Sequence, residues 1–316
     1  MKSKIILNPK HLVILASLLF LFACNKDKED LSTAQDNSKL NSLYSENNLK
    51  PIISNFPNNV GISTYGPGGS RLVIQPNTFV DVNGNIISGT INIEFTDYTN
   101  RTDMVFSKIL PISNGEPLIS GGEYNLKASA NGAEVFIAPG KTIEVKLPQN
   151  AAFNNTGMEF FRGEFIQNIA QESANTVNWF EPETLSVGTI ITATDTISIF
   201  NDSTGLCNAD KFFTSPNYVD FDIEVNGATI KGTTFQGYCF YKGLNAVWSL
   251  PINLSNTIEA KQIPDLECHF VVFGYYQGEL YAGTITDITP QNNVKLNITL
   301  IKTDASTLKN LMKTWL

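Results

Sequence analysis

The sequence predicts an all-β protein that has two antiparallel, immunoglobulin-like β-sandwich domains in tandem and a short C-terminal helix. Three observations predict this class. Short runs alternate apolar and polar residues with a period of two, turn-forming pairs separate the runs, and the body of the chain lacks long stretches of helical periodicity. Because parallel strands need crossover segments, usually helices, antiparallel sheets are favoured.

The alternation is clearest in four runs, residues 91–95, 143–147, 219–225 and 294–300. In the third, Val219, Phe221 and Ile223 are separated by acidic residues, as expected for a strand with one buried and one solvated face. Asn-Gly pairs such as Asn83-Gly84 and Asn226-Gly227 tolerate the positive φ of tight hairpin turns.

A chain of 316 residues exceeds the usual size of one domain, and its composition changes along its length. We expect a signal peptide over 1–23, a flexible polar tether over 24–50, and a first β-sandwich over 51–150. A structured β connector over 151–198 and a second sandwich over 199–316 follow. In the last segment, Asp304 can cap a helix that places Leu308, Leu311, Met312 and Trp315 or Leu316 on one face.

The first residues have the layout of a bacterial lipoprotein signal. A lysine-bearing start precedes an apolar run over residues 12–22, and Leu21-Phe22-Ala23-Cys24 resembles the lipobox read by lipoprotein signal peptidase. This predicts cleavage before Cys24, lipid attachment to its thiol, and a membrane anchor of acyl chains such as palmitate. The alternative is an ordinary secretory signal that ends in cysteine by chance.

The residues after Cys24 bear on localisation. Lys28-Glu29-Asp30 resembles the Lys followed by two acidic residues that marks lipoproteins of the Bacteroidota for surface export. We therefore expect an outer-membrane, lipid-anchored protein exposed at the cell surface. A solvated charge run in a flexible spacer is the alternative.

Two further segments carry a family resemblance. Residues 68–79, with Asp81, Gly84 and Gly89, and Ser120-Gly121-Gly122-Glu123-Tyr124 resemble uncharacterised surface lipoproteins of the Bacteroidota, whose N-terminal half is similar to the β-sandwich module of ankyrins and netrin receptors. Residues 206–212 resemble a Trp-Ile-Asn-Cys-Asp-Arg-Phe element of the same lipoproteins, with Leu206 in place of Trp and Ala209 in place of Cys. The resemblance implies a fold and a location, and it implies no catalytic residues.

Charge and cysteine content exclude some functions. The formal charge of −8 becomes −11 when the leader, with Lys2, Lys4 and Lys10, is removed, so no nucleic-acid partner is expected. Once Cys24 carries lipid, Cys207, Cys239 and Cys268 allow at most one disulfide, and the sequence leaves open which two would pair.

The search for catalytic chemistry finds few candidates. His269 is the only histidine after the leader, and we interpret it as a structural strand residue. Paired carboxylates could hydrolyse glycosides, and the candidates are Glu159, Glu164, Asp220 and Asp222, although their alternating context favours a solvated face. We expect no catalytic residue, no metal and no cofactor.

Three weaker candidates remain. Asp81 to Asn85 offers oxygen ligands as calcium loops do, but the residues favour a hairpin turn. Tyr275, Tyr276 and Tyr281 could form a sugar-stacking platform or could close a sheet face. Asp195-Thr196-Ile197 and Asp202-Ser203-Thr204 resemble the O-glycosylation acceptor of the Bacteroidota, which makes Thr196 and Ser203 possible glycosylation sites in an exposed segment.

These observations predict a non-enzymatic lipoprotein with a binding, adhesion or envelope-structural role. Its partners would be the membrane, through acyl chains on Cys24, and an extracellular polysaccharide or protein. The alternative from a different class is a carboxylate-dependent glycan hydrolase or a glycan-binding accessory protein.

Overall fold

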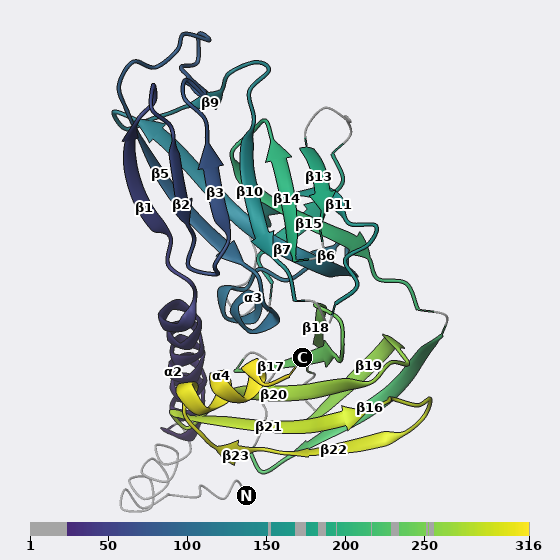
Figure 1. Cartoon of the computed structure of the whole chain (residues 1–316). Helices are drawn as coiled ribbons and strands as arrows, with labels where there is room; N and C mark the ends of the chain where they lie inside the picture. The colour runs from purple at the N-terminus through teal and green to yellow at the C-terminus, as the bar shows by residue number, and fades with distance from the viewer. Residues whose placement is uncertain are drawn as a thin grey trace, which may run out of the picture.

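Two β-sandwich modules, with three helices at and beside their junction, form the fold seen in the computed structural model (Figure 1). The structure describes residues 24–150, 153–167, 175–182, 188–193, 195–215, 217–228, 234–250, 252 and 256–315. The predicted leader, residues 1–23, lies outside this range. The strands of the upper module run roughly across those of the lower module in Figure 1.

The first module consists of two facing sheets. One has the order β1 (Ile52–Pro57), β5 (Thr90–Tyr98), β7 (Glu116–Ala130), β15 (Gly205–Phe212), β11 (Glu159–Phe165) and β12 (Val177–Phe180), and β6 (Ile112–Ser113) and β8 (Ala133–Glu134) also pair with β7. The other has the order β13 (Gly188–Thr192), β14 (Thr196–Asn201), β10 (Ile143–Pro148), β3 (Arg71–Ile74) and β2 (Ile62–Tyr65). A short pair, β4 (Phe79–Val80) and β9 (Phe136–Ile137), closes one end.

The second module has a three-stranded and a five-stranded sheet. The three-stranded sheet has the order β19 (Thr257–Pro264), β16 (Tyr218–Asn226) and β22 (Lys295–Thr299). The five-stranded sheet has the order β18 (Val247–Leu250), β17 (Phe235–Tyr241), β20 (Cys268–Tyr276), β21 (Glu279–Ile288) and β23 (Ile301–Lys302). The helices are α2 (Cys24–Asn47), α3 (Arg101–Ser107) and α4 (Ala305–Lys313). The predicted all-β class with sandwich sheets and a C-terminal helix is confirmed. Among the described strands, one pair is parallel, β16 with β22.

Strand pairing gives a module boundary different from the expected one at 198/199. β14 pairs with β10, and β15 pairs with both β7 and β11, so the first module continues to Phe212. The segment expected as a connector supplies β11, β12, β13 and part of β14. Local alternation shows that a strand exists, but the choice of partner depends on contacts between residues far apart in the sequence.

The segment expected as a flexible tether is the helix α2. From Asp36 onward it lies against the second module: the Asp36 carboxylate accepts hydrogen bonds from the backbone N–H groups of Gln277 (3.0 Å) and Gly278 (2.6 Å). Leu40, Leu43 and Tyr44 are buried, at 1%, 3% and 4% exposure. Their spacing of three and four residues places them on one face, which gains stability only where a partner surface covers it.

A buried apolar cluster joins the two modules. It combines residues of α2, α3 (Met104, Phe106) and α4 (Leu308, Met312) with large side chains on the sheet faces, among them Phe273. The hydroxyl groups of Tyr44 and Tyr238 also form a hydrogen bond with each other at 2.9 Å. The helices therefore fill the junction and hold the modules together.

The C-terminal helix follows the prediction except at Leu311, and Leu316 lies outside the described residues. The Asp304 carboxylate caps α4 by accepting from the backbone N–H of Thr307 at 2.9 Å. Leu308 and Met312 are buried, whereas Leu311, expected on the same face, is 39% exposed. The ring of Trp315 stacks on His269 of β20 at 5.1 Å, so the helix docks on the five-stranded sheet.

Candidate functional site

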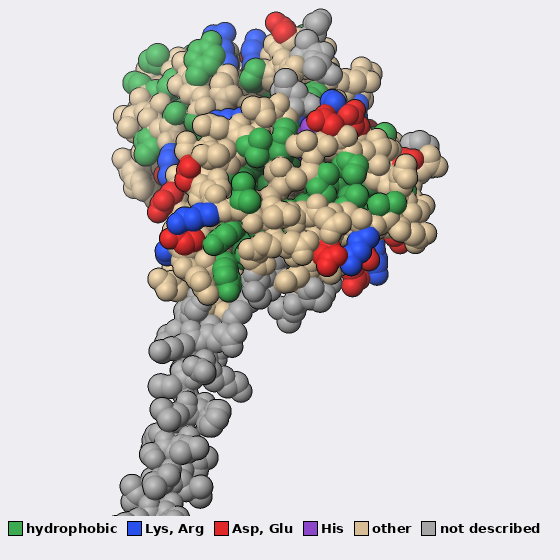
Figure 2. Space-filling model, turned by 90° about the horizontal axis from the view of Figure 1, so that it is seen from below, with side chains coloured by type: hydrophobic (Ala, Val, Ile, Leu, Met, Phe, Trp, Pro, Cys, Tyr) green, Lys and Arg blue, Asp and Glu red, His purple; other side chains and the backbone are tan. Residues whose placement is uncertain are grey.

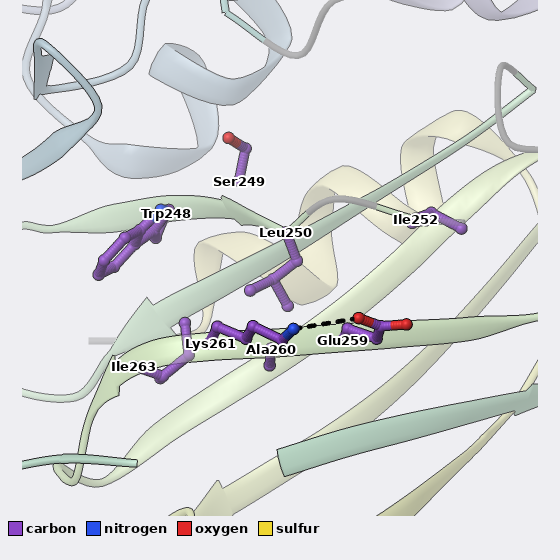
Figure 3. A pocket seen from close by; sticks show the side chains of 8 residues that line it. All are labelled: Trp248, Ser249, Leu250, Ile252, Glu259, Ala260, Lys261 and Ile263. Atoms are coloured by element: carbon purple, nitrogen blue, oxygen red, sulfur yellow. Dashed lines mark ion pairs between the residues drawn. The ribbon is translucent and has the colours of Figure 1, made fainter. Parts of the chain in front are cut away.

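A groove in the second module is the candidate binding site (Figure 3). It lies between β18, the edge strand of the five-stranded sheet, and β19, the edge strand of the three-stranded sheet. Its volume is about 450 Å³, and the residues that line it are Trp248, Ser249, Leu250, Ile252, Glu259, Ala260, Lys261 and Ile263.

The groove has an apolar floor and a charged rim. Leu250, Ala260 and Ile263 are buried at 4%, 1% and 2% exposure, and Trp248 is half-buried against the core of the module. Lys261 and Glu259 form an ion pair at 3.4 Å along the rim (Figure 3). Among the described strands, β18 and β19 each pair on one side only, and the outer side of an edge strand is where another chain can add to a sheet.

The four carboxylates considered for hydrolysis do not come together. Glu159 and Glu164 are five residues apart on β11, about 16 Å along an extended strand, and they point to opposite faces. Asp220 and Asp222 share the exposed outer face of β16 in the other module. There the Asp220 carboxylate accepts a hydrogen bond from the backbone N–H of Gln262 at 2.8 Å.

Glu159 has a carboxyl neighbour that the sequence did not indicate. Its side chain is hydrogen-bonded to Glu181. Burial is the larger cause and this contact the smaller cause of a raised pKa at Glu181. Both line a groove of about 430 Å³ with Met158, Phe160, Pro182, Gly188 and Ile190. Two carboxyl groups in direct contact are closer than the separations of about 5–5.5 Å and 6.5–9.5 Å that glycosidases use.

His269 lies in a fixed structural position. It is 5% exposed, and its Nδ1 atom accepts a hydrogen bond from the backbone N–H of Asp287 at 3.1 Å. Burial lowers the pKa of His269, which keeps the imidazole neutral and able to accept that bond. This matches the structural interpretation drawn from the sequence.

The three remaining cysteines are buried free thiols. Cys207 lies 2.9 Å from the side-chain amide nitrogen of Asn201, and burial raises its pKa to about 11. Cys239 and Cys268 contact each other across β17 and β20, in diagonal positions of the ladder. Burial raises the pKa of Cys207 and of Cys239, whereas a reactive thiol has a lowered pKa.

The tyrosines do not form one platform. Tyr276 and Tyr281 contact each other edge-on at 6.3 Å, whereas Tyr275 lies under Lys39 of α2. Alternation along β20 places Tyr275 and Tyr276 on opposite faces.

The Asp81 carboxylate accepts hydrogen bonds from the backbone N–H groups of Asn83 and Asn85, both at 2.9 Å, as in the hairpin turn that the residues favour.

The predicted modification sites lie in different settings. Thr196, the first residue of β14, and Ser203, in the turn after it, are half-buried, and the Ser203 hydroxyl donates to the side-chain oxygen of Asn201 at 3.0 Å. Cys24 is the first residue of α2. Lipid attachment and O-glycosylation stay predictions.

Sequence reasoning missed a buried acidic pair, Glu123 on β7 and Asp210 on β15, both at 0% exposure. Their segments, 120–124 and 206–212, were singled out for a family resemblance, and the structure pairs them as adjacent strands. The described residues contain no cluster of three or more His, Cys, Asp or Glu side chains that could hold a metal ion.

The surface charges of the lower module are paired. Lys242 bridges Glu267 and Asp287, each at 2.8 Å, and Lys295 pairs with Glu224 at 2.8 Å. In the view from below, basic and acidic groups lie next to one another around hydrophobic side chains (Figure 2). This face shows no basic patch of the kind that nucleic-acid binding requires.

No protein-family model matches the chain, and no curated protein is significantly similar to it. No helix in the described part of the chain combines the length and the apolar character needed to cross a bilayer.

Proposed function

We propose that this chain is a lipid-anchored lipoprotein of the outer membrane, exposed at the cell surface, that binds a partner and catalyses no reaction. The residues around Cys24 support the anchor, and the resemblance to surface lipoproteins of the Bacteroidota supports the location. In this proposal acyl chains on Cys24 hold the N-terminus, and α2 connects the anchor to the second module.

The observation that carries the binding role is the groove between β18 and β19. It combines an apolar floor with two strands, β18 and β19, that stand at the edges of their described sheets. An extended polypeptide segment can add to such an edge through main-chain hydrogen bonds, while alternate side chains enter the groove. We propose that the partner is a protein that presents such a segment.

Trp248 is the residue that favours a polysaccharide as the second candidate partner. Aromatic rings stack on sugar faces, but this ring is half-buried against the module core. The groove therefore favours a peptide strand, and a sugar chain remains a distinct outcome of the binding experiment.

The test uses the mature chain, residues 24–316 with Cys24→Ser, on peptide and glycan arrays, followed by titration with the best ligand. Lys261→Glu places two acidic side chains at the groove rim. The matched control is Lys127→Glu in the first module. Both lysines are 67% exposed and paired with a glutamate.

We expect a peptide ligand whose affinity falls about tenfold in Lys261→Glu and stays unchanged in Lys127→Glu. Equal affinities would exclude this groove as the binding site. Binding of glycans alone would replace the peptide partner with a polysaccharide. Glycan cleavage that is lost in Glu159→Gln would favour the hydrolase alternative.

A further inference from the structure

Four buried side-chain oxygens near the module junction have no hydrogen-bond donor. They are both carboxyl oxygens of Glu123, Oδ1 of Asp210 and the amide Oδ1 of Asn208. All three residues are at 0% exposure. A buried polar atom without a partner is destabilising, and more so when it carries charge, so a group of four requires an explanation.

The three side chains lie on one face of the sheet. Glu123 of β7 is directly opposite Asn208 of β15, which brings their Cβ atoms to about 5 Å. The Asn208 amide nitrogen donates to Oδ2 of Asp210 at 2.7 Å, beside a bulge in β7 that sets Gly121 and Gly122 opposite Ala209. Burial raises the pKa of Glu123, and repulsion from the Asp210 carboxyl group raises it further. The two carboxyl groups are therefore close neighbours.

Asp210 is hydrogen-bonded to the Ser120 side chain and to the backbone of Gly121, but no positive charge is paired with either carboxyl group among the described residues. No described lysine, arginine or histidine forms an ion pair with either carboxyl group. Tyr98 of β5 is opposite Glu123 on its other side. Asn245 of the second module forms two hydrogen bonds with the neighbouring Ser120, both at 2.9 Å. The backbone N–H of Ser120 donates to the backbone oxygen of Asn245, and the Asn245 side-chain amide donates to the backbone oxygen of Ser120.

We propose that Glu123, Asp210 and Asn208 bind a calcium ion at the junction of the two modules. The set consists only of oxygens, which suits a hard cation, and its two negative charges balance Ca²⁺. Four side-chain oxygens leave room for carbonyl or water ligands to complete the usual six to eight. Magnesium keeps several waters and demands a strict octahedron, so it fits a fully buried site with two unpaired Glu oxygens less well.

The competing explanation is that protons neutralise the carboxyl groups. The two explanations differ in how stability responds to calcium and to pH. Calcium must displace those protons, so its affinity should rise as pH rises. Neutral carboxyl groups alone predict no response to calcium at any pH.

The test is thermal unfolding of the mature chain, residues 24–316 with Cys24→Ser, at pH 7.5 in EDTA and in calcium. At a calcium concentration about 100-fold above Kd, we expect the melting temperature to rise by about 5 °C. Glu123→Gln and Asp210→Asn should abolish the rise. The control Glu94→Gln, an exposed residue of β5, should keep it.

A second readout is independent of variant folding. Terbium should replace calcium and emit when tyrosine is excited, because Tyr98 lies opposite Glu123, and calcium should quench this emission by competition. Tyr98→Phe should reduce the signal. An unchanged melting temperature in calcium, a calcium response that survives Glu123→Gln, or no competed terbium emission would each overturn the proposal.

Discussion

At the scale of single residues, the junction depends on a buried arginine that is paired with no acidic side chain in the described part of the chain. The guanidinium of Arg101 donates to the carbonyl oxygen of Tyr241 and, at 2.7 Å, to that of Trp315. It thereby ties α3 to β17 and to the end of α4. Burial lowers the pKa of Arg101 to about 10, which still leaves it charged at neutral pH.

Arg101→Lys should destabilise the protein by about 2 kcal/mol. A lysine cannot span both carbonyl groups with a planar fork, and one buried carbonyl would lose its donor. Urea unfolding measures the change in the free energy of unfolding. Arg71→Lys is the control, because Arg71 is exposed and donates only to the Ser63 hydroxyl. Equal effects of the two variants would contradict a bridging role for Arg101.

The buried carboxyl of Glu123 predicts a pH dependence. Its pKa is raised in the fold from an ordinary value of 4.5, so above that pH the unfolded chain releases a proton that the folded chain keeps. In EDTA, stability should therefore decrease as pH rises from about 4.5 to 8.

Glu123→Gln removes this titration. In EDTA the variant should gain stability relative to the unchanged chain, and the gain should grow from pH 4.5 to pH 8, as measured by urea unfolding at each pH. A gain that is independent of pH, or a loss that grows with pH, would show that Glu123 is ionised in the calcium-free fold.

Sequence reasoning succeeded for residues whose neighbours along the chain decide their role. The Asp81 turn and the Asp304 cap are local, and the residue types determine them. Asn208 and Asp210, two residues apart on a strand, look like a solvated face, yet both are buried, and Asn245 of the second module bonds to Ser120, the strand partner of Asp210. That information lies in contacts between modules, not in the local pattern.

At the scale of elements, strands were predictable and the helix α2 was not. Period-two alternation over 143–147 and 219–225 corresponds to β10 and β16. Most of α2 is polar, and few apolar residues interrupt it, so the segment shows too little apolar surface to predict a helix. Its buried apolar side chains, Leu40, Leu43 and Tyr44, stabilise the helix by packing in the cluster at the junction with the second module.

The docking of α2 can be tested with Leu43→Ala, which removes a side chain that is 3% exposed. We expect a loss of about 2–4 kcal/mol of unfolding free energy, because a cavity would remain between α2 and the sheet. Leu311→Ala, at 39% exposure on α4, should cost clearly less. If α2 were not packed on the second module, Leu43→Ala would lower the free energy of unfolding as little as Leu311→Ala. Limited proteolysis would then cut the chain in α2 first.

At the scale of the whole molecule, the fold class followed from the sequence while the module boundary did not. The pairing of β15 with β7 joins residues about 80 positions apart, and no local pattern encodes it. The shared junction of α2, α3 and α4 makes the two modules one body. Display at a surface would therefore present the β18–β19 groove at a fixed orientation relative to the helix that begins at Cys24.

The measurement that tests this account most directly is the mass of the N-terminal peptide of the native protein, purified from membranes. We expect a chain that begins at Cys24 and carries a diacylglyceryl group, and we expect Cys24→Ser to leave the leader uncleaved. A free thiol at Cys24, or a native chain that retains residues 1–23, would contradict the proposed lipoprotein.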